Sequence, residues 1–327
     1  MTIITNTFLV FDAKGVREEL SNLIALISPE DTPVLSGSRR GTVSNTLYEW
    51  QRDALAAASS ANAQLQGDDI DNLTGFAAVT PTVRMGNRTQ ISRKTIIIAD
   101  TLEATERAGR DREMAREISK RSAELKRDQE KTILENIGAV AGSSGVAPKT
   151  GTLGATVGSI DGTNVSMGAT GTNPTDALLF TDPRNDGTQR PFTEALLKTV
   201  VQGVWTLGGS PDILSVGPFN KGVVSGFAGV ATKTYFQEAR RPAATIASAD
   251  VYVSEFGNFS VVPNRFQRER DAWLLDLDAI RVVTLRPYKV VPLAKTGDAE
   301  KRLLIVEWGL AVDHEQRLGL VADLLTS

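Results

Sequence analysis

The sequence contains no cysteine and only one histidine, His314, among its 327 residues. The lack of cysteine excludes disulfides, thiolate zinc sites, iron–sulfur clusters and a cysteine nucleophile. One histidine excludes a metal site built on a histidine pair within the chain. It leaves a Ser-His-Asp triad only if His314 is the base. The sequence therefore offers no site built on thiolates or on a pair of histidines.

An excess of charge of one sign and long apolar runs are also lacking. Lys and Arg number 36 against 39 Asp and Glu, which gives a formal net charge of −3. This balance argues against a dedicated nucleic-acid binder, because such proteins usually present a basic face. No run of about 18 apolar residues exists to span a bilayer, and the N-terminus lacks the positive start of a secretory signal. The length predicts about two domains.

Residues 1–45 are typical of an arm with little core of its own. Apolar side chains recur at helical spacing over 12–28, with Asp12 as a capping residue, so a short amphipathic helix is expected there. Proline at position 29 ends this helix, because the residue before a proline is pushed out of the α region.

Residues 46–99 predict an extended β-hairpin. Alternation in its first limb places Tyr48 and Trp50 on one side, a polar segment follows, and strand-like residues return over 79–99. A two-stranded ribbon alone is marginal in water, so this element is expected to find a partner elsewhere. The charged residues divide between an acidic tip and a basic returning limb: Asp68, Asp69 and Asp71, then Arg84, Arg88, Arg93 and Lys94.

Residues 100–138 show the clearest helical pattern. A narrow apolar seam is surrounded by ten acidic and nine basic side chains. A helix of about 30 residues would be about 45 Å long. The charges either keep this helix soluble or meet neighbouring subunits.

The remaining sequence predicts an α/β region followed by strands. Residues 139–190 are rich in Gly, Thr, Ser and Asn, which favours a surface loop or an irregular insertion. A helix starting at Thr193, a buried strand over 213–216 and a hairpin at Gly257-Asn258 complete residues 139–262. Residues 263–327 are expected to be mostly strands.

Motifs for cofactors and metals are missing. Lys149-Thr150 follows a proline rather than the glycine of a phosphate loop, and no G-x-G-x-x-G links a strand to a helix. The acidic cluster lacks the spacing of a calcium-binding loop. We therefore expect no catalytic, cofactor-binding or metal site. A hydrolase that uses His314 remains the alternative from another functional class.

Seven short motifs, taken in order, resemble the major capsid proteins of tailed bacteriophages, which have the Hong Kong 97-like fold. They extend across nearly the whole chain, apart from 139–190. The motifs are Ser28-Pro29-Glu30-Asp31-Thr32-Pro33, Asn45-Thr46-Leu47-Tyr48-Glu49-Trp50, Asn87-Arg88-Thr89-Gln90-Ile91, Val251-Tyr252-Val253-Ser254-Glu255-Phe256-Gly257, Val262-Pro263-Asn264-Arg265, Leu293-Ala294-Lys295-Thr296-Gly297-Asp298-Ala299 and Ile305-Val306-Glu307-Trp308.

The resemblance implies an α+β fold and assigns a part to each region. The N-terminal arm is 1–45, the extended loop 46–99, the spine helix of the peripheral domain 100–138, the axial domain 139–262 with its insertion at 139–190, and the peripheral-domain strands 263–327. It also implies self-assembly into hexamers and pentamers of an icosahedral head that encloses double-stranded DNA without reading its sequence. The chain would be made in the host bacterial cytoplasm and reside in the virion. An encapsulin-like cellular compartment of the same fold is the alternative.

The interface hypothesis rests on the charges of the extended loop. We expect Asp68, Asp69 and Asp71 to meet cations of a neighbouring subunit, with Trp50, Arg84, Arg88 and Arg93 in the same contact surface. Some members of the fold form a Lys–Asn crosslink from this loop, but no lysine lies between Lys14 and Lys94. The arm motif begins by residue 28, so we expect a separate scaffolding or cement protein, and a portal protein, as partners.

Overall fold

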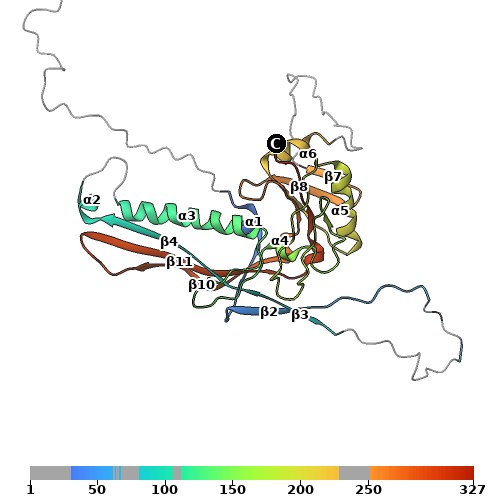
Figure 1. The fold of residues 1–327 in the computed structure, drawn as a ribbon, viewed down its shortest axis with the longest axis horizontal. Helices are drawn as coiled ribbons and strands as arrows, with labels where there is room; N and C mark the ends of the chain where they lie inside the picture. The colour runs from blue at the N-terminus through green and yellow to red at the C-terminus, as the bar shows by residue number, and fades with distance from the viewer. Residues whose placement is uncertain (1–30, 62, 64–65, 68–80, 106–111, 228–250) are drawn as a thin grey trace, which may run out of the picture.

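Three β-sheets organise the chain in the computed structural model, which describes residues 31–61, 63, 66–67, 81–105, 112–227 and 251–327 (Figure 1). The helices are α1 (Pro33–Gly37), α2 (Asp100–Ala104), α3 (Glu113–Ile133), α4 (Leu153–Thr156), α5 (Glu194–Thr206) and α6 (Pro218–Ser225), with 3-10 turns η1 (Leu277–Ala279) and η2 (Glu315–Arg317). The strands are β1 (Arg39–Thr42), β2 (Leu47–Arg52), β3 (Val83–Arg88), β4 (Gln90–Ala99), β5 (Val165–Ser166), β6 (Ile213–Val216), β7 (Val251–Ser254), β8 (Gly257–Pro263), β9 (Ala272–Leu275), β10 (Ile280–Pro292), β11 (Ala299–Val312) and β12 (Gly319–Val321).

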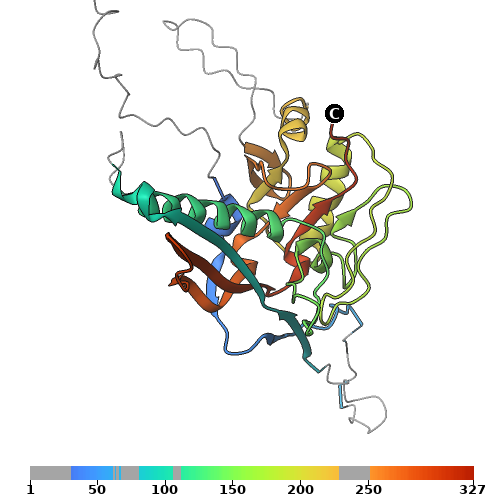
Figure 2. The ribbon, with the colours of Figure 1, turned by 60° about the vertical axis from the view of Figure 1, so that its left-hand side comes forward.

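The long sheet has four strands in the order β1-β10-β11-β4. β10 and β11 form an antiparallel pair, β4 adds antiparallel to β11, and β1 adds parallel to β10. Helix α3 lies along one face of this sheet, beside β4 and β11 (Figures 1 and 2). It places Leu125 and Ile133 in a fully buried core with Leu304, Val306 and Trp308 of β11. Burial of this apolar stripe fixes the charged helix on the sheet.

The second sheet has six strands in the order β5-β12-β9-β6-β8-β7. Apolar residues of α5, such as Leu197 and Val200, pack on Leu214, Phe259 and Leu274 of this sheet. The helix at Thr193, the buried strand over 213–216 and the hairpin at Gly257-Asn258 occur as the sequence predicts, because each is specified by its own local pattern.

The predicted helix over 100–138 is wrong in length. Described residues in this range form α2 and, after a break, the 21-residue α3, about 32 Å long. Thr105 and Arg112 have extended backbones, so one helix cannot run through them. Helix α3 ends at Ile133, before the predicted residue 138. The carbonyl of Glu135 accepts instead from Gly154 N and Thr152 Oγ1, so it is not available to continue the helix.

Residues 46–99 do not form one hairpin. β2 pairs with β3, whereas β4 pairs with β11 in the long sheet. The strand-like returning limb therefore divides between two sheets, on either side of Thr89. The backbone N–H of Thr89 donates to Thr46 O, and its hydroxyl donates to Glu307 Oε1 at 2.9 Å.

Residues 1–45 are not all arm. Val34 and Leu35 of α1 are buried in the core beneath α3, and β1 is a strand of the long sheet. The expected helix over 12–28 lies outside the described residues.

Two further expectations from the sequence differ from the structure. Within 139–190, residues 141–147 are exposed, but Leu153, Ala155 and Phe180 are buried, so only part of this segment is a surface loop. Within 263–327, β9 and β12 belong to the six-stranded sheet, and only β10 and β11 belong to the long sheet. Their pairing partners are distant in sequence, which local periodicity does not reveal.

Candidate subunit interface

The β2–β3 ribbon is fastened to the body at its root. Tyr48 Oη donates to Leu310 O at 2.7 Å. Asn87 Nδ2 donates to the same carbonyl at 2.7 Å, and Asn87 Oδ1 accepts from Gly151 N at 2.8 Å. Gly309 makes this approach possible, because a Cβ at that position would overlap the Tyr48 hydroxyl. Burial raises the pKa of Tyr48, which keeps the phenol protonated as a donor.

Trp50 holds the next part of the ribbon. Its ring stacks with Tyr48 and Phe180, with centroid distances of 6.0 and 6.1 Å, and it packs on Met85. Alternation along β2 places Tyr48 and Trp50 on the same side, as the sequence predicts. The structure thus gives Trp50 contacts within its own chain.

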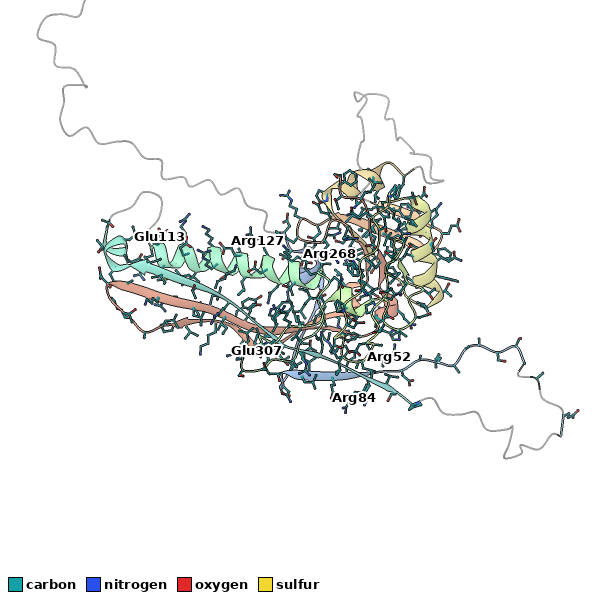
Figure 3. All side chains as sticks on the ribbon, in the orientation of Figure 1. Arg52, Arg84, Glu113, Arg127, Arg268 and Glu307 are labelled. Carbon is teal, nitrogen blue, oxygen red and sulfur yellow. The ribbon has the colours of Figure 1, made fainter. Side chains whose placement is uncertain are left out.

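The three arginines predicted on one limb occupy different surfaces. Arg84 is exposed on the ribbon (Figure 3), with 71% of its side chain accessible, and pairs with Glu49 at 3.2 Å. Arg88 is half-buried opposite Leu47. Arg93 is exposed on β4, in the long sheet. The acidic residues Asp68, Asp69 and Asp71 lie outside the described residues. The structure therefore separates Arg93 from the other two arginines.

The face of the long sheet opposite α3 carries an exposed surface that the sequence reasoning missed. Alternate residues of β4 point there, and Ile91 and Ile97 are 43% and 64% exposed. The register places Ile305 beside Arg93, and Lys301 beside Ile97. We call this surface the open sheet face; its members are Ile91, Arg93, Thr95, Ile97, Lys289, Val291, Lys301, Leu303 and Ile305. In the sequence, the strand-like run over residues 90–99 was the only local sign of this surface.

His314 does not have the surroundings of a catalytic base. Burial, and then the positive charges of Arg52 and Arg317, lower its pKa. No serine or threonine lines the cavity next to it among the described residues. A nucleophile within hydrogen-bond distance is required for a triad, so the geometry does not favour the hydrolase alternative.

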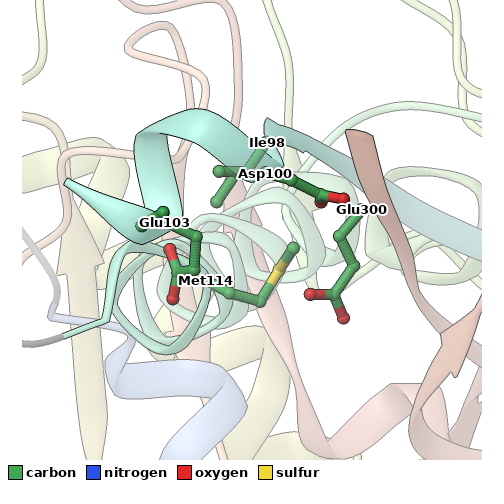
Figure 4. A pocket seen from close by; sticks show the side chains of 6 residues that line it. Ile98, Asp100, Glu103, Met114 and Glu300 are labelled. Atoms are coloured by element: carbon green, nitrogen blue, oxygen red, sulfur yellow. The ribbon is translucent and has the colours of Figure 1, made fainter. Parts of the chain in front are cut away.

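A second cavity, of about 300 Å³, is bounded by Asp100, Glu103 and Glu300, with Ile98 and Met114 as apolar lining (Figure 4). These carboxylates interact within the chain. Asp100 pairs with Lys295, Glu300 pairs with Arg302, and Glu103 Oε2 accepts from Glu113 N at 3.2 Å. No cluster of ligating side chains fit to hold a metal ion occurs in the described part of the chain. The described residues include no helix that is long and apolar enough to cross a membrane.

A known family matches the chain along almost its whole length. Over residues 3–325 it matches the family described as SU10 major capsid protein. The chain belongs to the SU10 major capsid protein family. The major capsid protein of Escherichia phage Phieco32 is 27% identical over 333 residues, which cover 93% of this chain and 93% of that protein. The resemblance to tailed-phage capsid proteins is therefore confirmed.

Solved structures confirm the Hong Kong 97-like, α+β fold of this SU10-family chain. The cyanophage A-1(L) capsid has a TM-score of 0.62 at 11% identity, over 95% of this chain and 98% of that chain. The capsid of a native GTA particle has a TM-score of 0.64 at 10% identity, over 97% and 98%. The SrpI encapsulin of Synechococcus elongatus has a TM-score of 0.54 at 9% identity, over 95% and 93%. The encapsulin shares the fold, whereas the family match is to phage capsid proteins. Membership in this family of structural proteins implies that the chain is not an enzyme.

Proposed function

We propose that the chain is the major capsid protein of a tailed phage, which self-assembles into hexamers and pentamers of an icosahedral head around double-stranded DNA. The family match over residues 3–325 carries this proposal. Repeated copies in a ring contact one another through different patches, and this chain offers a projecting ribbon and a separate open sheet face. Scaffolding or cement and portal proteins are its proposed partners, the host cytoplasm its proposed place of synthesis, and the virion its destination.

The contact that we propose joins the loop tip of one copy to the open sheet face of the next. The tip carries Asp68, Asp69 and Asp71, and the open sheet face carries Arg93, Lys289 and Lys301 around exposed isoleucines. Opposite charges steer and register the contact, and burial of the isoleucines adds apolar area. Arg84 and Arg88 flank this contact on the ribbon, and Trp50 keeps the ribbon in place on its own body.

Reversing the three tip carboxylates (Asp68→Lys, Asp69→Lys and Asp71→Lys) is expected to reduce the assembled fraction without unfolding the subunit. Exposed ion pairs contribute about 0–1 kcal/mol each, so the effect depends on many repeated copies. Sedimentation and electron microscopy measure assembly, and circular dichroism of subunits measures folding.

The matched control reverses the proposed partner charges in the same protein, with Arg93→Glu, Lys289→Glu and Lys301→Glu. Recovery of shells in the sixfold variant supports the pairing. Normal shells from the tip variant alone contradict it. If neither wild-type chains nor variants form shells with the required partners present, the proposed function itself fails.

The extended loop is expected to form no covalent crosslink from a lysine, because none lies between Lys14 and Lys94. Native particles dissolved in hot detergent should therefore run as single chains of 35.1 kDa on a denaturing gel. A ladder of covalent multimers would show that this prediction is wrong.

A further inference from the structure

A cavity of about 260 Å³ lies where the β2–β3 ribbon meets the body. This volume is below the range of about 300–1,000 Å³ that is typical of sites for drug-sized ligands. The size suits one side chain from another molecule. The lining residues come from the end of the ribbon and from the body: Arg52, Asp53, Ala54, Pro81, Val83, Ile160, His314 and Gln316.

Two polar groups of this cavity have no hydrogen-bond partner among the described residues. Arg52, labelled in Figure 3, is the last residue of β2. It makes no hydrogen bond or ion pair with the described residues, although a guanidinium offers five N–H donors. The Nδ1 atom of His314 is buried and also has no hydrogen-bond partner in the described part of the chain. Buried polar groups are nearly always hydrogen-bonded, so His314 Nδ1 points to a missing ligand. The half-buried guanidinium of Arg52 lines the same cavity and is the charged group that such a ligand would meet.

The charges around the cavity favour an anionic ligand. Arg317 already pairs with Asp276. The side chain of Glu315 is turned inward, where its Oε2 accepts from Gly158 N at 2.8 Å and from Asn164 Nδ2 at 3.1 Å.

Asp53 is exposed, and its Oδ1 accepts from the neighbouring Ala54 N at 2.9 Å. Among the described residues around the cavity, Arg52 is therefore the cation that has no carboxylate in direct contact.

We propose that this cavity binds the carboxylate side chain of an acidic residue from a second copy of the chain. Arg52 forms the ion pair, and His314 Nδ1 donates the second hydrogen bond. The apolar walls, Ala54, Pro81, Val83 and Ile160, cover the methylene stem of the incoming side chain. This proposal rests on the proposed self-assembly, and it places a subunit contact at the end of the β2–β3 ribbon, beside Arg52 and Val83.

Binding of the carboxylate is coupled to proton uptake by the only histidine of the chain. Burial and the charges of Arg52 and Arg317 hold the pKa of His314 below 6.5 while the cavity is empty. A carboxylate beside the ring favours its charged form, so occupancy raises this pKa. The other charged groups near the ring are the same whether the cavity is empty or occupied. They are Asp53, Glu315, Asp276, Arg52 and Arg317. Binding is therefore expected to be tighter at pH 6 than at pH 8.

The experiment uses full-length chains labelled with ¹³C-histidine, in which His314 gives the only imidazole signal. Propionate, which reproduces the glutamate side chain, is titrated into dissociated subunits. We expect the His314 signal to shift and its titration midpoint to rise. Arg52→Ala should weaken propionate binding by about tenfold or more, the loss expected for one charge-assisted hydrogen bond. The same signal is then recorded in assembled shells without propionate, where we expect it at the bound position.

Controls separate the possible sources of the ligand. Arg265→Ala removes an exposed arginine elsewhere and should leave propionate binding unchanged, and neutral propionamide should not bind. The proposal is overturned if propionate has no effect, if Arg52→Ala binds it equally well, or if propionamide shifts the signal as propionate does. It is also overturned if shells form with His314 at its empty position, a result that leaves the proposed capsid function intact.

Discussion

Replacing Glu130 with alanine is expected to lower the free energy of unfolding by about 3–5 kcal/mol. Glu130 lies on α3 and is fully buried. Its carboxylate accepts from Val34 N at 3.1 Å, from Leu35 N at 2.6 Å and from Asn264 Nδ2 at 2.6 Å. Alanine leaves three buried donors without an acceptor, each at a cost of about 1–3 kcal/mol before relaxation. Urea unfolding of subunits, followed by tryptophan fluorescence, measures the change.

The conservative control is Glu130→Gln, which keeps the volume but replaces one acceptor oxygen with an amide donor. We expect it to lose about 1–2 kcal/mol, clearly less than the alanine variant. Hydrogen exchange at Val34 and Leu35 should accelerate more in Glu130→Ala than exchange within α5, because Glu130 holds α1 on the spine helix. Equal stability of the alanine variant and the wild type would contradict this assignment.

This carboxylate illustrates what the sequence could not predict. Glu130 is one of ten acidic residues in 100–138, and its local pattern matches that of a solvent-exposed helix face. Its burial depends on α1 and Asn264, which are about 95 and 134 residues away. Helix α5 was predictable because its apolar stripe and its terminal glycines lie within one segment.

The candidate interface was predictable only in part, for the same reason. A strand-like run through Arg84, Arg88 and Arg93 was visible, but the change of sheet occurs at a single residue, Thr89. That change is specified by long-range bonds of Thr89 to Thr46 and Glu307. From this strand-like run, the sequence analysis placed all three arginines on the returning limb of one hairpin. In the structure, pairing of β4 with β11 places Arg93 on the open sheet face instead.

Burial within 139–190 depends on side chains from elsewhere that bind its backbone. Asn87 Nδ2 donates to Gly151 O at 2.9 Å, and Asn136 Nδ2 donates to Arg184 O at 2.7 Å. These bonds satisfy backbone groups without helix or sheet, so a segment rich in glycine and threonine becomes part of the core. Composition alone favoured a surface loop.

The second large effect is expected at the buried ion pair between Arg184 and Asp271, which ties this segment to β9. Both side chains are fully buried, and Arg184 Nη2 lies 2.5 Å from Asp271 Oδ1. Asp271→Asn keeps the volume but removes the nearest counterion of the buried guanidinium, which then keeps only the longer contact with Asp186 at 3.5 Å. We expect a loss of about 3–5 kcal/mol in the free energy of unfolding.

The double variant Arg184→Met/Asp271→Asn tests whether the loss comes from the unpaired charge. Replacing a whole buried pair by uncharged side chains of similar size is often close to neutral, so the double variant should recover to within about 1–2 kcal/mol of the wild type. Arg268 contacts the same carboxyl group at 3.7 Å and keeps its own partner, Asp186. The two single variants and the double variant form a cycle with an expected coupling of at least about 2 kcal/mol. Losses that simply add would show that the two charges are held independently, and the pair would then not be what fastens the segment to the six-stranded sheet.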